Sequence, residues 1–214
     1  RAVASSTTLG AISTSTLYAL CAMAIATVLG LMVALGVAYG SPRFVWLERI
    51  SVLPLTISAV TIGLGILITY DTAPYDFRST WIITPLAHSL IALPLVVRIV
   101  LPVVRQIPRG LQSVASTLGA TPLQTWLTVD RPLMLRAVGA SAAIAFAISI
   151  GEFGATSFLT RRSSETLPVT ISRLLSRPGD ALRTQAYALC VIIVVISMIA
   201  IFLIDMLRPA RKAK

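Results

Sequence analysis

Long apolar runs separated by short polar segments make up most of this chain of 214 residues. Five of these runs are long enough to cross a bilayer, which takes about 20 helical residues. None of them alternates apolar and polar residues as the strands of a membrane barrel do. We therefore expect an all-α membrane protein with about five transmembrane helices. The runs cover approximately residues 9–39, 50–70, 81–104, 133–159 and 184–207.

Composition and charge fit a multi-pass protein surrounded by membrane lipid. Hydrophobic residues make up 56% of the chain and charged residues only 12%, which excludes an ordinary soluble domain. The net charge of +10 comes from short loops and the C-terminus, where it sets topology and does not indicate nucleic-acid binding. We expect a single transmembrane domain over residues 1–214.

Prolines and glycines predict irregular geometry in two of the runs. Pro54 and the glycines within residues 63–65 would loosen the second run locally. Pro85, Pro94 and Pro102 predict a third span that is kinked or broken more than once. Such breaks occur where helices line a cavity but also in ordinary spans, so both interpretations stay open.

A polar segment at residues 105–132 separates the third and fourth runs. Its first half predicts a short amphipathic helix, because Leu111, Val114 and Leu118 share one helical face. Gly119 can end this helix, since glycine readily adopts the backbone angles of a helix C-terminus.

A second short helix is predicted directly afterwards. Thr121 is a good N-cap, Pro122 suits the first helical position, Leu123 and Trp126 form an apolar stripe, and Pro132 closes the helix. Helices of about ten residues are too short to be stable alone, so both need a partner surface. They either pack on the protein's own membrane ends or form a docking element for a separate cytosolic protein.

The segment resembles the EAA loop of ABC importer permeases, whose pattern is Glu-Ala-Ala, three residues, Gly, nine residues and Ile-x-Leu-Pro. In this chain Ser113, Val114 and Ala115 take the first three positions, and Gly119 and Pro132 keep the spacing. Ser113 replaces the glutamate of the pattern. An acidic contact to an ATPase from this position is therefore not expected.

Further segments resemble the ferric-iron and thiamine branch of these permeases, namely AHSLIALPLVVRIVLPVVRQIPRGL, SIGEFGATSFL and LPVTISRLLSRPG. GEFGAT also occurs in molybdate and sulfate permeases. The resemblance covers nearly the whole chain and implies the membrane-spanning subunit of a type I ABC importer, similar to a C-terminal half. It implies ferric iron or thiamine as cargo, with molybdate or sulfate as the alternative.

The resemblance also implies partners: a cytosolic ABC ATPase dimer that binds ATP and magnesium, a second permease half, fused or separate, and an extracytoplasmic substrate-binding protein. The sequence has no GxxxxGK[ST] phosphate loop, CxxC motif or paired carboxylates, so we expect a transport subunit without cofactor, metal site or enzymatic activity. The residues expected to couple to the ATPase are Ser113, Val114, Ala115, Leu118, Gly119, Leu123, Trp126 and Pro132.

His88 and Glu152 are ionisable residues inside predicted spans, where charge is unfavourable, so both are candidates for a pathway or gate. Gly151 and Gly154 beside Glu152 would let another backbone approach. Counted along their helices, His88 and Glu152 lie about 10 Å and 8 Å below the outer surface, which predicts that they can pair. A hydrogen-bonded structural role stays open. So does a proton relay in a carrier driven by an ion gradient.

Charge predicts orientation only weakly. If the 105–132 segment is cytosolic, ten Lys and Arg residues lie inside and seven outside. The N-terminus is then outside and the C-terminus in the cytosol, in a plasma or inner membrane. Arg98 remains within a span near its inner end, and we interpret it as a side chain that snorkels to the interface.

The outer segment at residues 160–183 is polar and basic. Leu167, Ile171, Leu174 and Leu175 predict a short helix within it that lies at the membrane interface. This helix either contacts the extracytoplasmic binding protein or serves as a plain connector.

Overall fold

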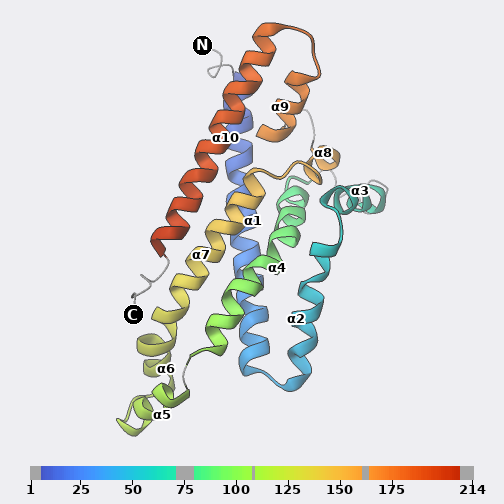
Figure 1. Ribbon diagram of the computed structural model, residues 1–214. Coiled ribbons are helices and arrows are strands. Elements are labelled where there is room, and N and C mark those ends of the chain that lie inside the picture. The colour runs from blue at the N-terminus through green and yellow to red at the C-terminus, as the bar shows by residue number, and fades with distance from the viewer. Residues whose placement is uncertain (1–5, 71–79, 108, 161–163, 208–214) are drawn as a thin grey trace.

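The computed structural model describes residues 6–70, 80–107, 109–160 and 164–207 (Figure 1). Every regular element in these residues is a helix, which confirms the predicted all-α fold.

Three helices among the described residues are long and apolar enough to cross a membrane: α1 (Ser6–Tyr39), α4 (Ile83–Arg105) and α10 (Asp180–Leu207). They correspond to the first, third and fifth predicted spans. A further helix, α7 (Arg131–Ile150), is apolar over a shorter stretch. The second and fourth predicted spans differ from the structure.

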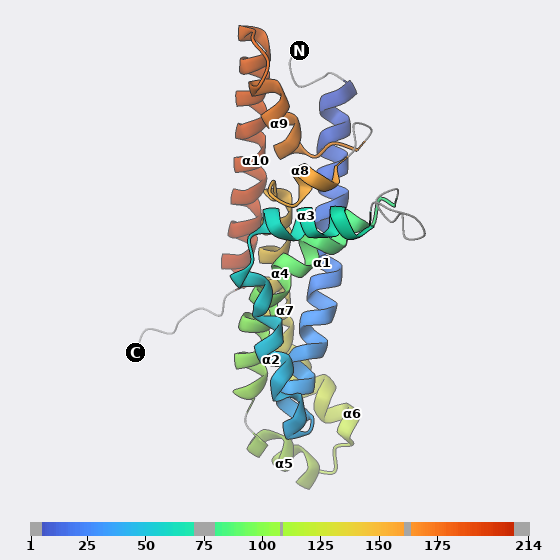
Figure 2. The ribbon, with the colours of Figure 1, turned by 90° about the vertical axis from the view of Figure 1, so that its right-hand side faces the viewer.

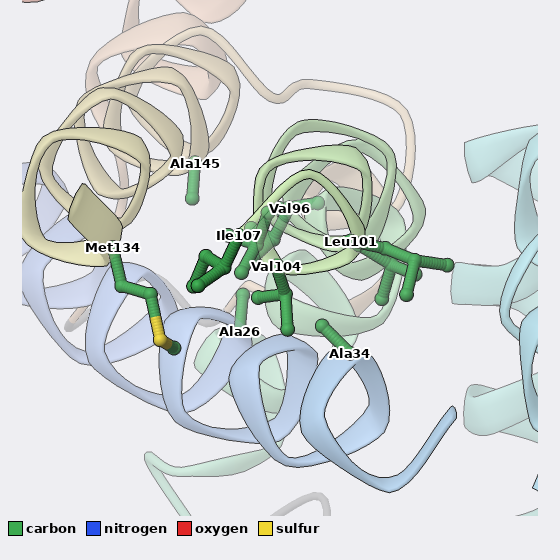
Figure 3. Close-up of a cluster of buried hydrophobic side chains, with 11 residues drawn as sticks. Ala26, Ala34, Val96, Leu101, Val104, Ile107, Met134 and Ala145 are labelled. Carbon is green, nitrogen blue, oxygen red and sulfur yellow. The ribbon is translucent and has the colours of Figure 1, made fainter. Parts of the chain in front are cut away.

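The core lies where α1, α4 and α7 pack together (Figure 3). Along α1, Ala26, Gly30 and Ala34 recur every four residues and form a strip of small side chains. Helix α4 packs so closely on this strip that a methyl group at Gly30 would overlap the side chain of Val96. Small residues at helix contacts are typical of membrane proteins, because close packing rather than apolar burial holds their helices together.

The prediction of a continuous second span over residues 50–70 is wrong. The chain forms the short helices η1 (Pro42–Phe44), α2 (Val45–Ser51) and η2 (Leu53–Thr56), and then turns by 96° into α3 (Ala59–Tyr70). Pro54 stands in the first turn of η2, and the extended residue Ile57 follows it and ends the helical path. Figure 2 shows α3 lying across the other helices. The glycines within residues 63–65 do not loosen α3, which is helical throughout.

The predicted break in the third span is not found, because α4 is one uninterrupted helix that contains Pro94 and Pro102, and the alternative of a kinked helix stays a prediction. Pro85 lies in its first turn, where the missing N–H has no acceptor to lose. The side chain of Pro94 is fully buried. Packing by neighbouring helices holds the helix together at the point where a backbone hydrogen bond is missing.

The fourth predicted span, over residues 133–159, is interrupted. Helix α7 ends at Ile150, and a short helix, α8 (Thr156–Leu159), begins after a non-helical segment that we name the 151–155 corner. The carboxylate of Glu152 accepts hydrogen bonds from two backbone N–H groups at the start of α8, at 3.0 and 3.1 Å. This side chain caps α8 and stabilises the break.

Helix α3 packs directly on the 151–155 corner. A methyl group at Gly63 would overlap the backbone of Ala155, and one at Gly154 would lie 3.2 Å from the backbone nitrogen of Val60. The expectation that small residues beside Glu152 let another backbone approach is therefore confirmed for Gly154, whereas a methyl group at Gly151 would meet only the carbonyl oxygen of Ala147 in the preceding helix, at 3.7 Å.

Three further short helices lie toward the two ends of the bundle (Figure 1). Helices α5 (Arg109–Thr117) and α6 (Pro122–Thr125) are at one end, and α9 (Leu167–Leu175) is at the other. The N–H of Leu167 donates to the hydroxyl of Ser15 at 2.6 Å, and the apolar face of α9 packs on α1 and α10. The predicted short helix exists, but most of its apolar residues face protein rather than a membrane interface.

Candidate functional site

The loop between α4 and α7 has the local structure that its sequence predicts. Gly119 ends the first helix with a φ of +82°, in the left-handed region that favours glycine. Thr121 and Gln124 then form a capping box, in which each side chain accepts a hydrogen bond from the backbone N–H of the other, at 3.3 and 2.8 Å. The positions of both signals are confirmed.

The prediction that Pro132 closes the second loop helix is wrong. A π-helical turn, η4 (Trp126–Asp130), joins α6 directly to α7, and Pro132 lies in the first turn of α7. Pro132 has no N–H to donate, and the π-helical turn lies just before it, where the hydrogen-bond pattern of the helix changes. The backbone therefore runs as one helical path from α6 into α7.

The apolar side chains of this loop are turned to solvent. Leu118 is 82% exposed and Leu123 66%, both among the highest values for a large apolar side chain in the described residues. Such a cluster of exposed apolar residues is typical of a protein contact surface. It does not support the alternative in which the loop packs on the protein's own membrane ends. The cluster, which we name the loop face, consists of Leu111, Val114, Leu118, Leu123 and Trp126.

Ser113, Ala115 and their neighbours lie on α5. Ser113 is exposed, and its carbonyl oxygen accepts hydrogen bonds from the hydroxyls of Ser116 and Thr117, at 2.7 and 2.9 Å. Ala115 is half-buried beside it. The position that carries a glutamate in the EAA pattern thus presents a short polar side chain at the surface of the loop.

A buried group of polar side chains lies at the other end of α4. It consists of His88, Ser149, Glu152 and Thr156, and we name it the His88 cluster. Nδ1 of His88 lies 2.7 Å from Oγ of Ser149, and its Nε2 lies 2.6 Å from Oγ1 of Thr156 and 3.4 Å from Oε2 of Glu152. All four residues are at most 8% exposed. The predicted pairing of His88 with Glu152 is confirmed.

A neutral imidazole with its proton on Nε2 satisfies the chain of side-chain hydrogen bonds that links the four residues. Ser149 then donates to Nδ1, Nε2–H donates to the Thr156 hydroxyl, and that hydroxyl donates to Oε2 of Glu152 at 2.7 Å. The same carboxylate caps α8. The cluster thus fastens α4 to the end of α7 and to α8, which is the structural role that the sequence left open. A gate role for its members stays a prediction.

The remaining candidate residues lie apart from this cluster. Gly151 ends α7 and is exposed. Arg98 is exposed on α4 and has no ion pair among the described residues, and its snorkelling stays a prediction. Arg105 forms a two-fold salt bridge with Glu48 of α2, at 2.6 and 3.2 Å, which ties the C-terminal end of α4 to α2. The described residues contain no group of three side chains suited to a metal.

The sequence analysis missed Ser149 and Thr156. Their positions three residues before and four residues after Glu152 are a usable signal, because a short hydroxyl side chain near a buried carboxylate is a common hydrogen-bond partner. It also missed Glu48, whose partner lies on another helix.

Comparison with known proteins supports the type I ABC importer permease and not the ferric-iron and thiamine branch. The putative 2-aminoethylphosphonate transport system permease protein PhnV of Salmonella typhimurium is 31% identical over 180 residues, 84% of this chain and 67% of the relative. The molybdenum transport system permease protein ModB of Haemophilus influenzae is 30% identical over 176 residues, 76% of each chain. The sulfate transport system permease protein CysT of Salmonella typhimurium is 28% identical over 180 residues, 79% of this chain and 65% of the relative.

A family model also matches residues 26–213. These residues include the second part of α1, all later helices, the loop face and the His88 cluster. The chain therefore belongs to the family of binding-protein-dependent transport system inner membrane components.

Proposed function

We propose that this chain is one membrane-spanning half of a binding-protein-dependent ABC importer, which moves a small solute into the cytosol by ATP-driven alternating access. The observation that carries the proposal is the exposed loop face at one end of the bundle. Five large apolar side chains on short helices need a protein partner. A cytosolic ABC ATPase dimer is that partner.

The path from the loop into the membrane supports this coupling role. Helix α6 continues through η4 into α7 without a break, so a displacement of the loop moves α7 directly. Helix α7 packs on α1 and α4, and α4 is fastened to it again by the His88 cluster. Closure of the ATPase dimer would therefore tilt these helices together.

We infer that the loop lies in the cytosol, with the N-terminal end of α1 outside and the C-terminal end of α10 on the cytosolic side. The loop and the outer segment at residues 160–183 lie at opposite ends of the bundle, as this orientation requires (Figure 1). The same orientation leaves α9 and its surroundings accessible to an extracytoplasmic binding protein. A second permease half, fused or separate, completes the pathway in the plasma or inner membrane.

We propose a small oxyanion as cargo in place of ferric iron or thiamine. The relatives named above are permeases for 2-aminoethylphosphonate, molybdenum and sulfate. Phosphonate, molybdate and sulfate share a compact anionic group with several oxygen acceptors. A small oxyanion also agrees with the GEFGAT segment, which occurs in molybdate and sulfate permeases.

Uptake into membrane vesicles tests this function. Vesicles that hold the complete complex and its binding protein should take up sulfate, molybdate or 2-aminoethylphosphonate only when ATP is present. Uptake of ferric iron or thiamine alone would overturn the cargo. Uptake driven by an ion gradient without ATP would overturn the importer and favour a carrier in which His88 and Glu152 relay protons.

Gly119 offers a separate test of the docking loop, with Gly110 of α5 as its matched control. A methyl group at either position would have no atom within 4 Å, so only backbone conformation separates the two glycines. Gly119→Ala should disfavour the turn by about 1 kcal/mol, because its φ is +82°. Gly110→Ala should favour the helix by about 0.5–1 kcal/mol. The fraction of ATPase that co-purifies should fall only for Gly119→Ala, and equal fractions would contradict the assignment.

A further inference from the structure

The 151–155 corner lies well inside the bundle. His88, which contacts both sides of the corner, is five residues into α4 and thus about 7.5 Å below the first residue of that helix. Figure 2 shows that α8 lies beside the corner and that α1, α9 and α10 extend beyond α8, on the side away from α5 and α6. In a protein whose long helices span a bilayer, the corner is at the depth of the outer part of the membrane.

Non-helical backbone at this depth cannot face lipid. Hydrocarbon offers no hydrogen-bond partner, so such segments occur only where they are buried in protein or line a water-filled cavity. Helix α3 covers one side of the corner through Gly63 and Gly154. Gly151 and Phe153 nevertheless remain exposed. The uncovered side of the corner must therefore face another protein surface or the pathway.

Neighbouring side chains of the corner have opposite environments. Glu152 is 8% exposed, and both of its carboxylate oxygens accept hydrogen bonds from donors within the protein, so the carboxylate is already engaged in the fold. Phe153 is 44% exposed, although it is among the largest apolar side chains of the segment. Its backbone is held on both sides, by the Glu152 cap and by the N–H of Ser157, which donates to the Phe153 carbonyl oxygen at 2.8 Å.

We propose that Phe153 is the closing side chain of the outer gate, where it meets the second permease half across the pathway, and that Glu152 and His88 are positioning residues that hold it there. This inference rests on the proposed importer function. It replaces the expectation that the ionisable residues themselves form the gate. A phenyl ring suits this task, because an apolar constriction blocks hydrated ions by excluding water.

Cysteine accessibility in the complete complex tests the gate. Cys21 and Cys190 are first replaced by alanine, and Phe153→Cys is then labelled with a membrane-impermeant maleimide from the outer side. The labelling rate should differ about fivefold or more between the nucleotide-free and ATP-trapped states. About fivefold is the smallest effect that one site typically has on another in an allosteric protein. Tyr187→Cys is the matched control, since Tyr187 is a 62% exposed aromatic residue near the outer end of α10 and its labelling should show no dependence on nucleotide.

Two results would overturn the gate: equal labelling of Phe153→Cys in both states, as at a water-filled surface, or no labelling in either state, as at a static contact between halves. ATP-driven uptake by the parent complex in the same vesicles separates this failure from failure of the importer. If the parent takes up cargo and labelling is constant, only the gate is wrong. If the parent shows no uptake, the function and the gate are both wrong.

A second set of variants tests the positioning role. In the Phe153→Cys background, Glu152→Ala and Thr156→Val should remove the nucleotide dependence of labelling, whereas Glu152→Gln, which keeps an acceptor for α8, should retain part of it. Ser157→Ala is the control, because its exposed hydroxyl donates only to the Gly154 carbonyl oxygen, at 2.8 Å. Unchanged nucleotide dependence in Glu152→Ala would show that the His88 cluster does not position Phe153.

Discussion

Replacing Leu118 and Trp126 together by alanine is expected to abolish ATP-driven uptake while leaving the protein folded in the membrane. These side chains are 82% and 43% exposed, so their loss leaves no cavity in the bundle. Burying each in a groove of the ATPase would contribute about 1.5–3 kcal/mol. The pair therefore contributes about 3 kcal/mol or more, which is more than a hundredfold in affinity. Uptake by vesicles and the amount of ATPase that co-purifies measure the effect.

Leu175→Ala provides the matched control for this variant. Leu175 is a 46% exposed leucine on the short helix α9, at the opposite end of the bundle. Its replacement should leave the co-purified ATPase unchanged. Unaltered uptake in the Leu118 and Trp126 variant would mean that the loop face does not dock the ATPase.

The second large effect is expected on stability, from Glu152→Ala. The variant leaves the N–H groups of Ala155 and Thr156 without their acceptor at a buried site. The Thr156 hydroxyl loses the carboxylate and keeps only the backbone carbonyl oxygen of residue 152, at 3.2 Å. Unsatisfied buried donors are each unfavourable by about 1–3 kcal/mol. We expect a loss of roughly 2–4 kcal/mol in the free energy of unfolding. Thermal unfolding of the complex in detergent measures the loss.

Glu48→Ala is the control for this prediction. Glu48 forms an ion pair with Arg105, and the two side chains are 36% and 47% exposed. Pairs in contact with solvent contribute about 1 kcal/mol or less. Equal losses for Glu48→Ala and Glu152→Ala would contradict the role assigned to the His88 cluster. In double-mutant cycles, His88→Ala should show an interaction energy with Glu152→Ala and none with Glu48→Ala.

The parts of the fold that follow from local chemistry could be predicted from the sequence. Gly119 and Thr121 act through their own backbone and side-chain preferences, and both are found where the sequence places them. Long apolar runs identify α1, α4 and α10, because length and composition suffice for a straight span. The pairing of His88 with Glu152 was accessible by counting residues along two helices.

Features that depend on contacts between distant segments could not be predicted. The turn of 96° before α3 brings Gly63 onto the backbone of Ala155. The sequence around either residue contains no signal that predicts this contact. Pro94 and Pro102 stay within one helix because neighbouring helices support it, which the sequence of α4 alone does not reveal. The cargo could not be predicted for a different reason, because motifs such as GEFGAT occur in permeases for different solutes.

The unbroken path from α6 through η4 into α7 gives the two ends of the protein a simple geometric relation. Helix α7 has 20 residues and is therefore about 30 Å long. A tilt of about 10° around its inner end would displace its outer end by about 5 Å, close to the width of a phenyl ring. Because the 151–155 corner begins at that outer end, a small angular adjustment near Trp126 would be amplified over the length of one helix into a displacement large enough to open or close an aperture.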